Sequence, residues 1–236
     1  MVLFQYHADV IERFPQIIAG VILAEGMHNQ RSQPELIALY RQEQQKVLAE
    51  IGTGPLSEIE TLAAWRKVFR GFGVNPTKYR SAVEALLRRL TKKGSIPSIN
   101  SLVDIANLVS IRYRLPVAFF DRQHIQGPIT VKFSDSTERF TPLFQDEVEQ
   151  PIEGEVIFAD EVDTVIARRW CWRQSDGSAT REDTSAALIT IEAQHESGHV
   201  AVESALQDVL GLLENYVGGH FMSAVLSASN PAFVVS

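Results

Sequence analysis

The sequence predicts a single α+β domain over residues 1–236, with helices first and strands afterwards. Two observations favour this class. Apolar residues recur mostly at helix spacing through residues 1–113, and over residues 114–193 they mostly alternate with a period of two, as strands do. A closing helical pattern covers about residues 200–217. Helices followed by clustered strands are typical of α+β proteins. Since no repeat, low-complexity segment or linker separates the parts, we expect one compact unit.

The N-terminal region is ambiguous in structure but informative about location. Apolar residues within residues 14–22 recur at helix spacing, although Pro15 and Gly20 leave a strand or a turn open.

The segment from Met1 carries acids and no basic leader, which argues against a secretory signal. No apolar stretch reaches the roughly 20 residues of a membrane span, and the single cysteine, Cys171, fits a reducing compartment. We therefore expect a cytoplasmic protein with no membrane partner.

Helix starts and stops are readable in the rest of the helix-rich part. Ser32–Glu35, Ser57–Glu60 and Ser101–Asp104 each place a hydroxyl three residues before an acid, which is a capping-box pattern. Asn75–Pro76 predicts a further start, with proline at the first helical position. Gly94, after two lysines, predicts where that helix ends.

The strand-rich part contains five candidate strands bounded by Pro, Gly and Asp clusters. After them, Thr180–Asp183 predicts a short helix, Leu188–Glu192 a strand, and Gly218 with Gly219 the end of the closing helix. The five strands are Val117–Phe120, Ile129–Phe133, Glu138–Phe140, Glu155–Ala159 and Thr164–Trp172.

The charge distribution is uneven. The net charge of -7 disfavours a nucleic-acid binder, because phosphate attraction needs a positive surface. Between Arg66 and Lys93, however, nine basic residues stand against one acid, Glu84, so this segment carries +8 and the rest of the chain -15. It is either an RNA-binding surface or an ordinary solvated helix face. The candidate RNA-binding residues are Lys78, Arg80, Arg88, Arg89, Lys92 and Lys93.

One motif has the residues of a zinc metalloprotease. His195, Glu196 and His199 fit the pattern in which two histidines one helical turn apart hold zinc and the glutamate activates water. The context disfavours this, because the motif directly follows a predicted strand and Ser197–Gly198 is typical of a turn. A zinc hydrolase stays an alternative, and we expect no metal and no cofactor.

A second motif combines arginine and tryptophan between Arg168 and Arg173. In a continuous strand, Arg168, Trp170 and Trp172 would share one face. That face would suit a nucleobase or an aromatic substrate through stacking and cation-π contacts. Alternatively, the two tryptophans fill a core and the arginines cover its edge. Cys171 has no recognisable activating base, so we expect it to pack rather than react.

Other classes of site find little support. The acidic cluster Asp160–Asp163 matches no calcium-loop spacing, and we interpret it as a turn between two strands. The sequence contains no phosphate-binding glycine loop, no Gly-x-Ser-x-Gly elbow and no kinase signature, which excludes those classes.

Several segments, in order and spacing, resemble the free-standing B-three/B-four domain proteins. They are Tyr79–Arg89, Ile96–Asn107, Leu115–Asp121, Gly154–Asp160 and Arg168–Gln174. This family takes its name from the β-subunit editing domain of phenylalanyl-tRNA synthetase, which removes tyrosine wrongly attached to its tRNA. The resemblance implies the same fold and a trans-acting editing factor that hydrolyses the ester of a mischarged tRNA.

The resemblance also implies residue roles. The family's asparagine corresponds to Asn107 and its late glutamate to Glu192, and these are the catalytic candidates that would orient substrate or water. The family's histidine falls on Ala118 and is lost here, and its small Ala-Gly stretch falls near Arg168, which implies a more cationic pocket. The candidate substrate-binding residues are Arg168, Trp170, Trp172, Arg173, Asp121 and Glu161.

Two functions remain open beside the zinc hydrolase. The first is hydrolysis of an aminoacyl-tRNA ester, with aminoacylated tRNA as the partner and the amino acid undetermined. The second is a non-catalytic module that binds tRNA, a nucleoside or a free amino acid, which the alanine at position 118 favours.

Overall fold

The central layer of the protein is a four-stranded antiparallel sheet with the order β3-β8-β2-β9. The computed structural model describes residues 1–235. The strands of this sheet are β2 (Ile18–Glu25), β3 (Val117–Asp121), β8 (Ala186–Ala193) and β9 (His220–Ser227).

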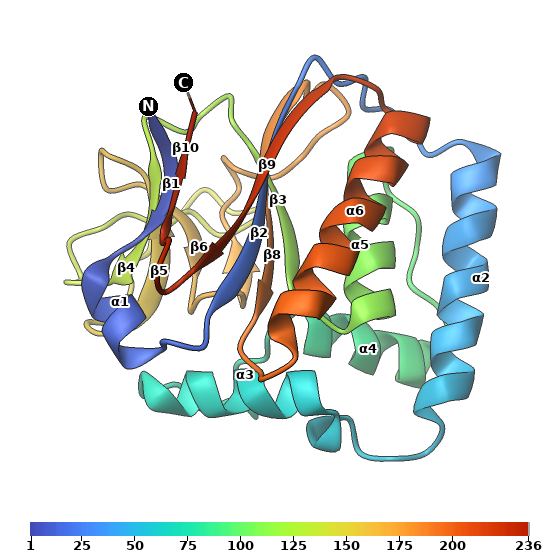
Figure 1. The fold of residues 1–236 in the computed structure, drawn as a ribbon, viewed down its shortest axis with the longest axis horizontal. Helices are drawn as coiled ribbons and strands as arrows, with labels where there is room; N and C mark the ends of the chain where they lie inside the picture. Colours follow the sequence, from blue (N-terminus) through green and yellow to red (C-terminus); the bar gives the residue numbers. More distant parts are fainter. Residues whose placement is uncertain (236) are drawn as a thin grey trace.

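A six-stranded sheet with the order β10-β1-β4-β5-β6-β7 packs against one face of the central sheet. Within it β1 and β4 are parallel and the other pairs are antiparallel. The pairing of β1 with β10 brings the two ends of the described chain together (Figure 1). The strands are β1 (Val2–Tyr6), β4 (Ile129–Phe133), β5 (Val156–Ala159), β6 (Val165–Arg168), β7 (Arg173–Gln174) and β10 (Ala232–Val234).

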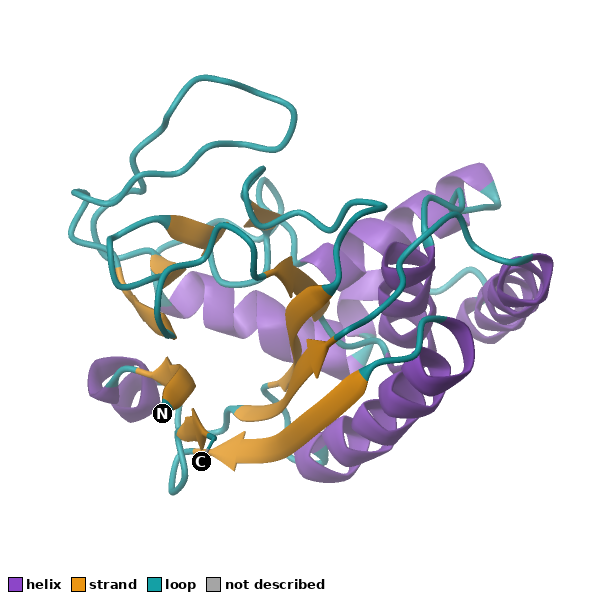
Figure 2. Ribbon diagram, turned by 90° about the horizontal axis from the view of Figure 1, so that it is seen from above, coloured by secondary structure: helices purple, strands orange, loops and turns teal. Residues whose placement is uncertain are grey.

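Helices cover the other face of the central sheet. The helices α5 (Ser101–Tyr113) and α6 (Gly198–Tyr216) lie on that face, and α2 (Pro34–Ile51) packs outside α5 (Figure 1). Seen from above, the strands lie between a helical side and a side dominated by loops (Figure 2). The remaining helices are α1 (Ala8–Arg13), the 3-10 turn η1 (Leu56–Glu58), α3 (Glu60–Gly71) and α4 (Ala82–Lys93).

The strand β2 contributes to both hydrophobic cores. Ile22 faces the core between the sheet and the helices, while Val21 and Leu23 face the core between the two sheets. Because both faces are buried, the strand is apolar at nearly every position. Gly20 allows α6 to approach, since a Cβ there would lie 3.1 Å from a methyl carbon of Leu206.

Of the structures left open for residues 14–22, the strand is confirmed at β2 and the helix is wrong, while β1 lies in the part expected to be rich in helices. A continuous apolar run satisfies helix spacing as easily as strand alternation, so the period does not separate the two. The predicted closing helix, the strands β3, β4, β5 and β8, and the helix α5 are confirmed within a few residues. None of the helices formed by residues 1–235 combines the length and apolar character needed to cross a membrane.

Several predicted caps are replaced by other groups. The hydroxyl of Ser32 donates to Asp104 at 2.6 Å instead of capping α2, whose first-turn N–H groups receive no side-chain cap. Residues 75–79 form a turn, and α4 begins after Ser81, whose hydroxyl accepts from the N–H of Glu84. The predicted end at Gly94 is confirmed, with φ at 75°. Thr180–Asp183 forms turns rather than a helix.

Candidate functional site

A pocket of about 440 Å³ opens between the helices α4 and α5 on one side and the strands β3 and β8 with the residues after β6 on the other. This volume lies in the range of small-molecule sites, about 300–1,000 Å³. Most of the wall is apolar. The polar and aromatic residues that line it include Asn107, Glu192, Trp170, Trp172, Arg89 and Arg173.

Glu192 is the buried acid of this pocket, with only 2% of its surface exposed. One carboxyl oxygen, Oε1, accepts hydrogen bonds from the Tyr6 hydroxyl at 2.5 Å and from the Trp170 indole N–H at 2.8 Å. Within residues 1–235, Oε2 accepts no hydrogen bond from a protein group. Burial raises the pKa of Glu192 to about 7, although the two hydrogen bonds act in the opposite direction. The carboxyl group therefore changes protonation near neutral pH.

Two neighbours of Glu192 stay protonated. Burial, followed by the nearby Glu192 carboxylate, raises the pKa of Tyr6 well above its usual value and does the same to the thiol of Cys171. The carbonyl of Cys171 accepts a 2.7 Å hydrogen bond from the N–H of Ala82. This bond ties the turn after β6 to the start of α4. Cys171 thus has a packing environment and no thiolate character.

Asn107 reaches the pocket from α5, and Ala118 reaches it from β3. Thr190, paired with Ala118 across the β3–β8 ladder, completes this part of the wall. The position to which the family resemblance assigns a histidine is therefore in the pocket but carries only a methyl group. Any proton transfer here has to use another side chain.

The chain turns sharply after β6, so residues 168–172 do not form the predicted strand. Arg169 and Trp170 have φ values of 46° and 60°, and Arg168 pairs with Arg173 of β7. The left-handed conformation of two successive residues breaks the strand alternation. Arg168, Trp170 and Trp172 consequently do not share one exposed face.

Arg168 lies outside the pocket lining and is 3% exposed. Its Nε donates to Glu155 at 2.7 Å and its Nη1 to Glu149 at 2.6 Å. The guanidinium carbon also lies 5.5 Å from the centre of the Phe140 ring. Two carboxylates thus neutralise this arginine within the protein.

The two tryptophans have different environments. Trp170 is fully buried, and its ring packs 5.4 Å from the rings of Trp65 and Phe14 while also lining the pocket. Trp172 is half-buried and lines the pocket beside the exposed Arg173. Trp170 therefore fills a core, as the second of the two interpretations expected. Of the two tryptophans, Trp172 is the one whose ring can stack on a ligand.

Asp121 and Glu161 also lie outside the pocket lining. Asp121 accepts hydrogen bonds from the Thr184 hydroxyl and from the N–H of Gln123, so it closes the loop after β3. Glu161 is exposed in the turn between β5 and β6.

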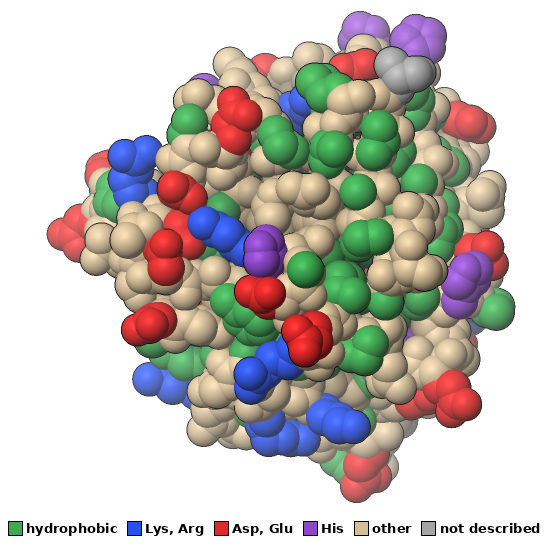
Figure 3. Space-filling model, turned by 60° about the vertical axis from the view of Figure 1, so that its left-hand side comes forward, with side chains coloured by type: hydrophobic (Ala, Val, Ile, Leu, Met, Phe, Trp, Pro, Cys, Tyr) green, Lys and Arg blue, Asp and Glu red, His purple; other side chains and the backbone are tan. Residues whose placement is uncertain are grey.

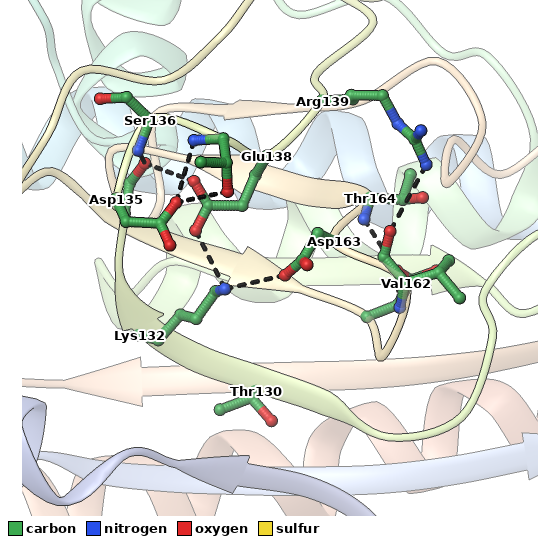
Figure 4. Close-up of polar contacts among 12 residues, drawn as sticks. Thr130, Lys132, Asp135, Ser136, Glu138, Arg139, Val162, Asp163 and Thr164 are labelled. Carbon is green, nitrogen blue, oxygen red and sulfur yellow. Dashed lines mark hydrogen bonds and ion pairs between the residues drawn. The ribbon is translucent and has the colours of Figure 1, made fainter.

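The acidic cluster around Glu161 is a structural turn. Asp160 accepts from the N–H groups of Val162 and Thr164. Asp163 pairs with Lys132 at 2.9 Å, and Lys132 also contacts Glu138 at 3.0 Å (Figure 4). These contacts confirm the interpretation of Asp160–Asp163 as a turn.

The basic segment divides into paired and unpaired cations. Arg66 and Arg80 contact the buried Glu84 at 2.9 and 3.7 Å, so they form part of an internal ion-pair network. Lys and Arg side chains gather along the lower part of the face in Figure 3, the edge along which α3 runs in Figure 1. The other candidate RNA-binding residues make no ion pair within residues 1–235. These are Lys78, Arg88, Arg89, Lys92 and Lys93.

The zinc-protease motif lies partly outside a helix, since α6 begins only at Gly198. His195 is buried in the preceding turn, where burial lowers its pKa, whereas the exposed His199 lies 3.3 Å from Glu203. Within the described residues, no group of three or more His, Cys, Asp or Glu side chains is placed to hold a metal ion. The arrangement lacks the single helix face on which such enzymes present both histidines.

Tyr6 is the site residue that the sequence did not reveal. It comes from β1, which the sequence pattern did not predict, and it reaches Glu192 only because the two sheets pack together. No motif surrounds it in the sequence.

Comparison with known proteins identifies relatives of this chain. Residues 64–207 match the B3/4 domain. The phenylalanine–tRNA ligase beta subunit of Fusobacterium nucleatum is 31% identical over 96 residues, which are 40% of this chain and 12% of that protein. The corresponding subunit of Colwellia psychrerythraea is 33% identical over 95 residues, 40% of this chain and 11% of that protein.

A solved structure is also similar. It is the crystal structure of an N-terminal fragment of the phenylalanyl-tRNA synthetase beta subunit from Pyrococcus horikoshii, with a TM-score of 0.48 and 13% identity. The match covers 95% of this chain and 54% of that chain. The aligned segments of the two curated relatives are a small part of each, 12% and 11% of their lengths.

Proposed function

Because this chain belongs to the B3/4 domain family, we propose that it hydrolyses the ester bond between an amino acid and tRNA. Its relatives include subunits of phenylalanine–tRNA ligase, which supports tRNA as the partner. The observation that carries the proposal is the buried Glu192 carboxyl in a pocket of about 440 Å³, with a pKa of about 7. A general base works best when its pKa lies near the working pH.

In the proposed reaction, the Oε2 atom of Glu192 accepts a proton from a water molecule as the water oxygen attacks the ester carbonyl. The new carbon–oxygen bond forms a tetrahedral intermediate, and its collapse breaks the bond to the ribose oxygen, which takes the proton back from the Glu192 carboxyl group. The Asn107 amide donates to the carbonyl oxygen and stabilises the charge that develops there. Tyr6 and Trp170 hold Oε1, so the base keeps one orientation.

The remaining pocket residues would bind the substrate. The apolar wall encloses the amino-acid side chain, and Arg89 and Arg173 provide positive charge for the phosphate groups of the tRNA end. Arg168, neutralised by Glu149 and Glu155, has no part in this scheme. The cations of α4 extend the positive surface along the RNA backbone.

A second candidate function is binding without catalysis, which Ala118 supports. A methyl group at the position of the family histidine transfers no proton and orients no water. In that case the pocket binds a free amino acid, a nucleoside or the tRNA end, and the ligand raises the melting temperature without being consumed.

Deacylation assays over a panel of mischarged tRNAs test the first function. We expect release of the amino acid above the buffer blank for at least one of them, and no change when the exposed Arg41 of α2 is replaced by Gln as a control. If no tRNA in the panel is deacylated, hydrolysis is contradicted. A ligand that stabilises the fold would then support the binding function.

A further inference from the structure

Two aromatic rings and two guanidinium groups form a cluster at the edge of the pocket. The rings of Tyr79 and Trp172 meet edge to face, with centroids 5.0 Å apart and planes 84° apart. The guanidinium carbon of Arg169 lies 3.9 Å from the Tyr79 centroid and 4.3 Å from the Trp172 centroid. That of Arg173 lies 4.7 Å from the Trp172 centroid. We call these four residues the rim cluster.

The rim cluster has a fixed cation and a free one. Arg169 is 4% exposed and lies 3.4 Å from the Glu155 carboxylate, so its position under the rings is held by the protein. Arg173 is exposed and, within residues 1–235, pairs with no acid. Tyr79 and Trp172 are each half-buried, and the Lys78 ammonium also lies 5.1 Å from the Tyr79 centroid. The cluster thus offers aromatic surface and unneutralised positive charge together.

The cluster is continuous with the pocket and with the cations of α4. Trp172 and Arg173 line the pocket, as does the exposed Arg89 of α4. Farther along the same helix, Lys92 and Lys93 are exposed. Positive charge that begins at a pocket and continues along a helix suits a polyanion whose end enters the pocket.

From these contacts we infer that the rim cluster binds an unpaired nucleobase at the end of an RNA, with the adjoining phosphate neutralised by Arg89 and Arg173. Aromatic rings beside guanidinium groups accept any base, because every base has a π face. The inference rests on the proposed function, since it places the terminal nucleotide outside the pocket while the pocket holds the attached amino acid.

Titration with an unacylated single-stranded oligoribonucleotide tests the inference without requiring hydrolysis. Tryptophan fluorescence follows binding of the RNA, because Trp172 of the rim cluster is half-buried and Trp170 lines the adjoining pocket. The comparison ligand is the same RNA with an abasic 3′-terminal nucleotide, which keeps the phosphate charge and removes the base. We expect the abasic RNA to bind about tenfold more weakly, equivalent to about 1.4 kcal/mol. Equal affinities would overturn the inference.

Titration with a nucleoside monophosphate tells whether the bound base belongs to an RNA end or to a free nucleotide. We expect it to bind more weakly than the RNA, because it cannot reach the cations of α4. A monophosphate that binds as tightly as the RNA would identify a free nucleotide as the ligand and would overturn the RNA assignment.

Two variants separate stacking from charge. Tyr79→Ala should weaken binding of the intact RNA about five- to tenfold and leave the abasic RNA unaffected, because it removes a ring and no charge. Arg173→Gln should weaken both RNAs, and the control Arg41→Gln on α2 neither. If Tyr79→Ala lowers only the melting temperature, the cluster is structural and the inference is wrong.

The rim-cluster inference and the proposed hydrolysis can be contradicted independently of each other. Base-dependent binding without deacylation of any mischarged tRNA contradicts the proposed hydrolysis and leaves the rim cluster as a nucleobase site. Deacylation by a protein that binds intact and abasic RNA equally well contradicts only the rim-cluster inference.

Discussion

The hydroxyl of Tyr6 donates a 2.5 Å hydrogen bond to Oε1 of Glu192, which joins β1 of the six-stranded sheet to β8 of the central sheet. The indole N–H of Trp170 binds the same oxygen at 2.8 Å. Both donors stabilise the charged form of a carboxyl group that burial would otherwise keep neutral. The contact between the two sheets therefore orients the candidate base and limits the rise in its pKa that burial causes.

Replacing Tyr6 with Phe should raise the pKa of Glu192 further. The lost hydrogen bond is worth about 0.5–1.5 kcal/mol, so the midpoint of the pH–rate profile should move up by as much as about one pH unit. The rate at high pH should change little, because the base is then deprotonated in both proteins. Tyr113→Phe is the matched control, since that hydroxyl binds Asp208 instead. A profile with an unchanged midpoint would show that Tyr6 does not control the base.

Glu192 should also make stability depend on pH. Its pKa rises from 4.5 in the unfolded chain to about 7 in the folded one, so the folded state binds more protons between these values. Stability from this group is greatest at low pH and falls as the pH rises towards 7. The loss is about 3 kcal/mol at about 1.4 kcal/mol per pH unit.

Urea unfolding of wild type and Glu192→Gln at several pH values measures this contribution. Glutamine does not titrate, so the variant should gain stability relative to wild type between pH 5 and pH 7.5, while all other groups cancel in the comparison. A difference between the two proteins that stays constant with pH would rule out the raised pKa.

Gly20→Ala should destabilise the protein by about 1–3 kcal/mol, because the new Cβ would lie 3.1 Å from Leu206 and 3.2 Å from Val202. Gly211→Ala, in α6 with open space around it, should instead stabilise by about 0.5–1 kcal/mol. Denaturant midpoints measure both. Equal midpoints for Gly20→Ala and wild type would mean that α6 does not approach β2 as closely as described.

Arg168→Gln should lower stability by about 1–3 kcal/mol, because it leaves the buried Glu155 with only Arg169, at 3.4 Å, as a charged partner. Protein that remains folded should bind RNA as wild type does, since the side chain does not line the pocket. Thermal unfolding and RNA titration together make the test. A stable variant with a large loss of RNA affinity would return Arg168 to the binding site.

The parts of the fold with local signals could be predicted from the sequence. Gly94 ends α4 because it adopts a left-handed conformation, and Leu188–Glu192 is a strand in a short apolar run. For the segment of β2 the sequence left both a helix and a strand open, because burial on both faces removes the alternation that would decide between them. The turn at Arg169 and Trp170 was missed because non-glycine residues with positive φ leave no mark in the sequence.

The same distinction applies to the site. Asn107 and Glu192, assigned by resemblance, line one pocket with Trp172 and Arg173. Arg168 does not belong to that set, because it forms ion pairs with Glu149 and Glu155. These two partners lie elsewhere in the sequence, so no local pattern predicts the pairing. Long-range pairing of this kind, like the bond from Tyr6 to Glu192, depends on how the sheets pack and not on any local pattern.

The rate of ester hydrolysis by Glu192→Gln, measured on a mischarged tRNA that the wild type deacylates, tests the account most directly. We expect the variant to bind the uncharged tRNA with wild-type affinity and to release amino acid at least about a hundredfold more slowly, since general-base catalysis typically contributes about 10²–10⁴-fold. A variant that hydrolyses the ester as fast as the wild type would contradict the assignment of Glu192 as the base.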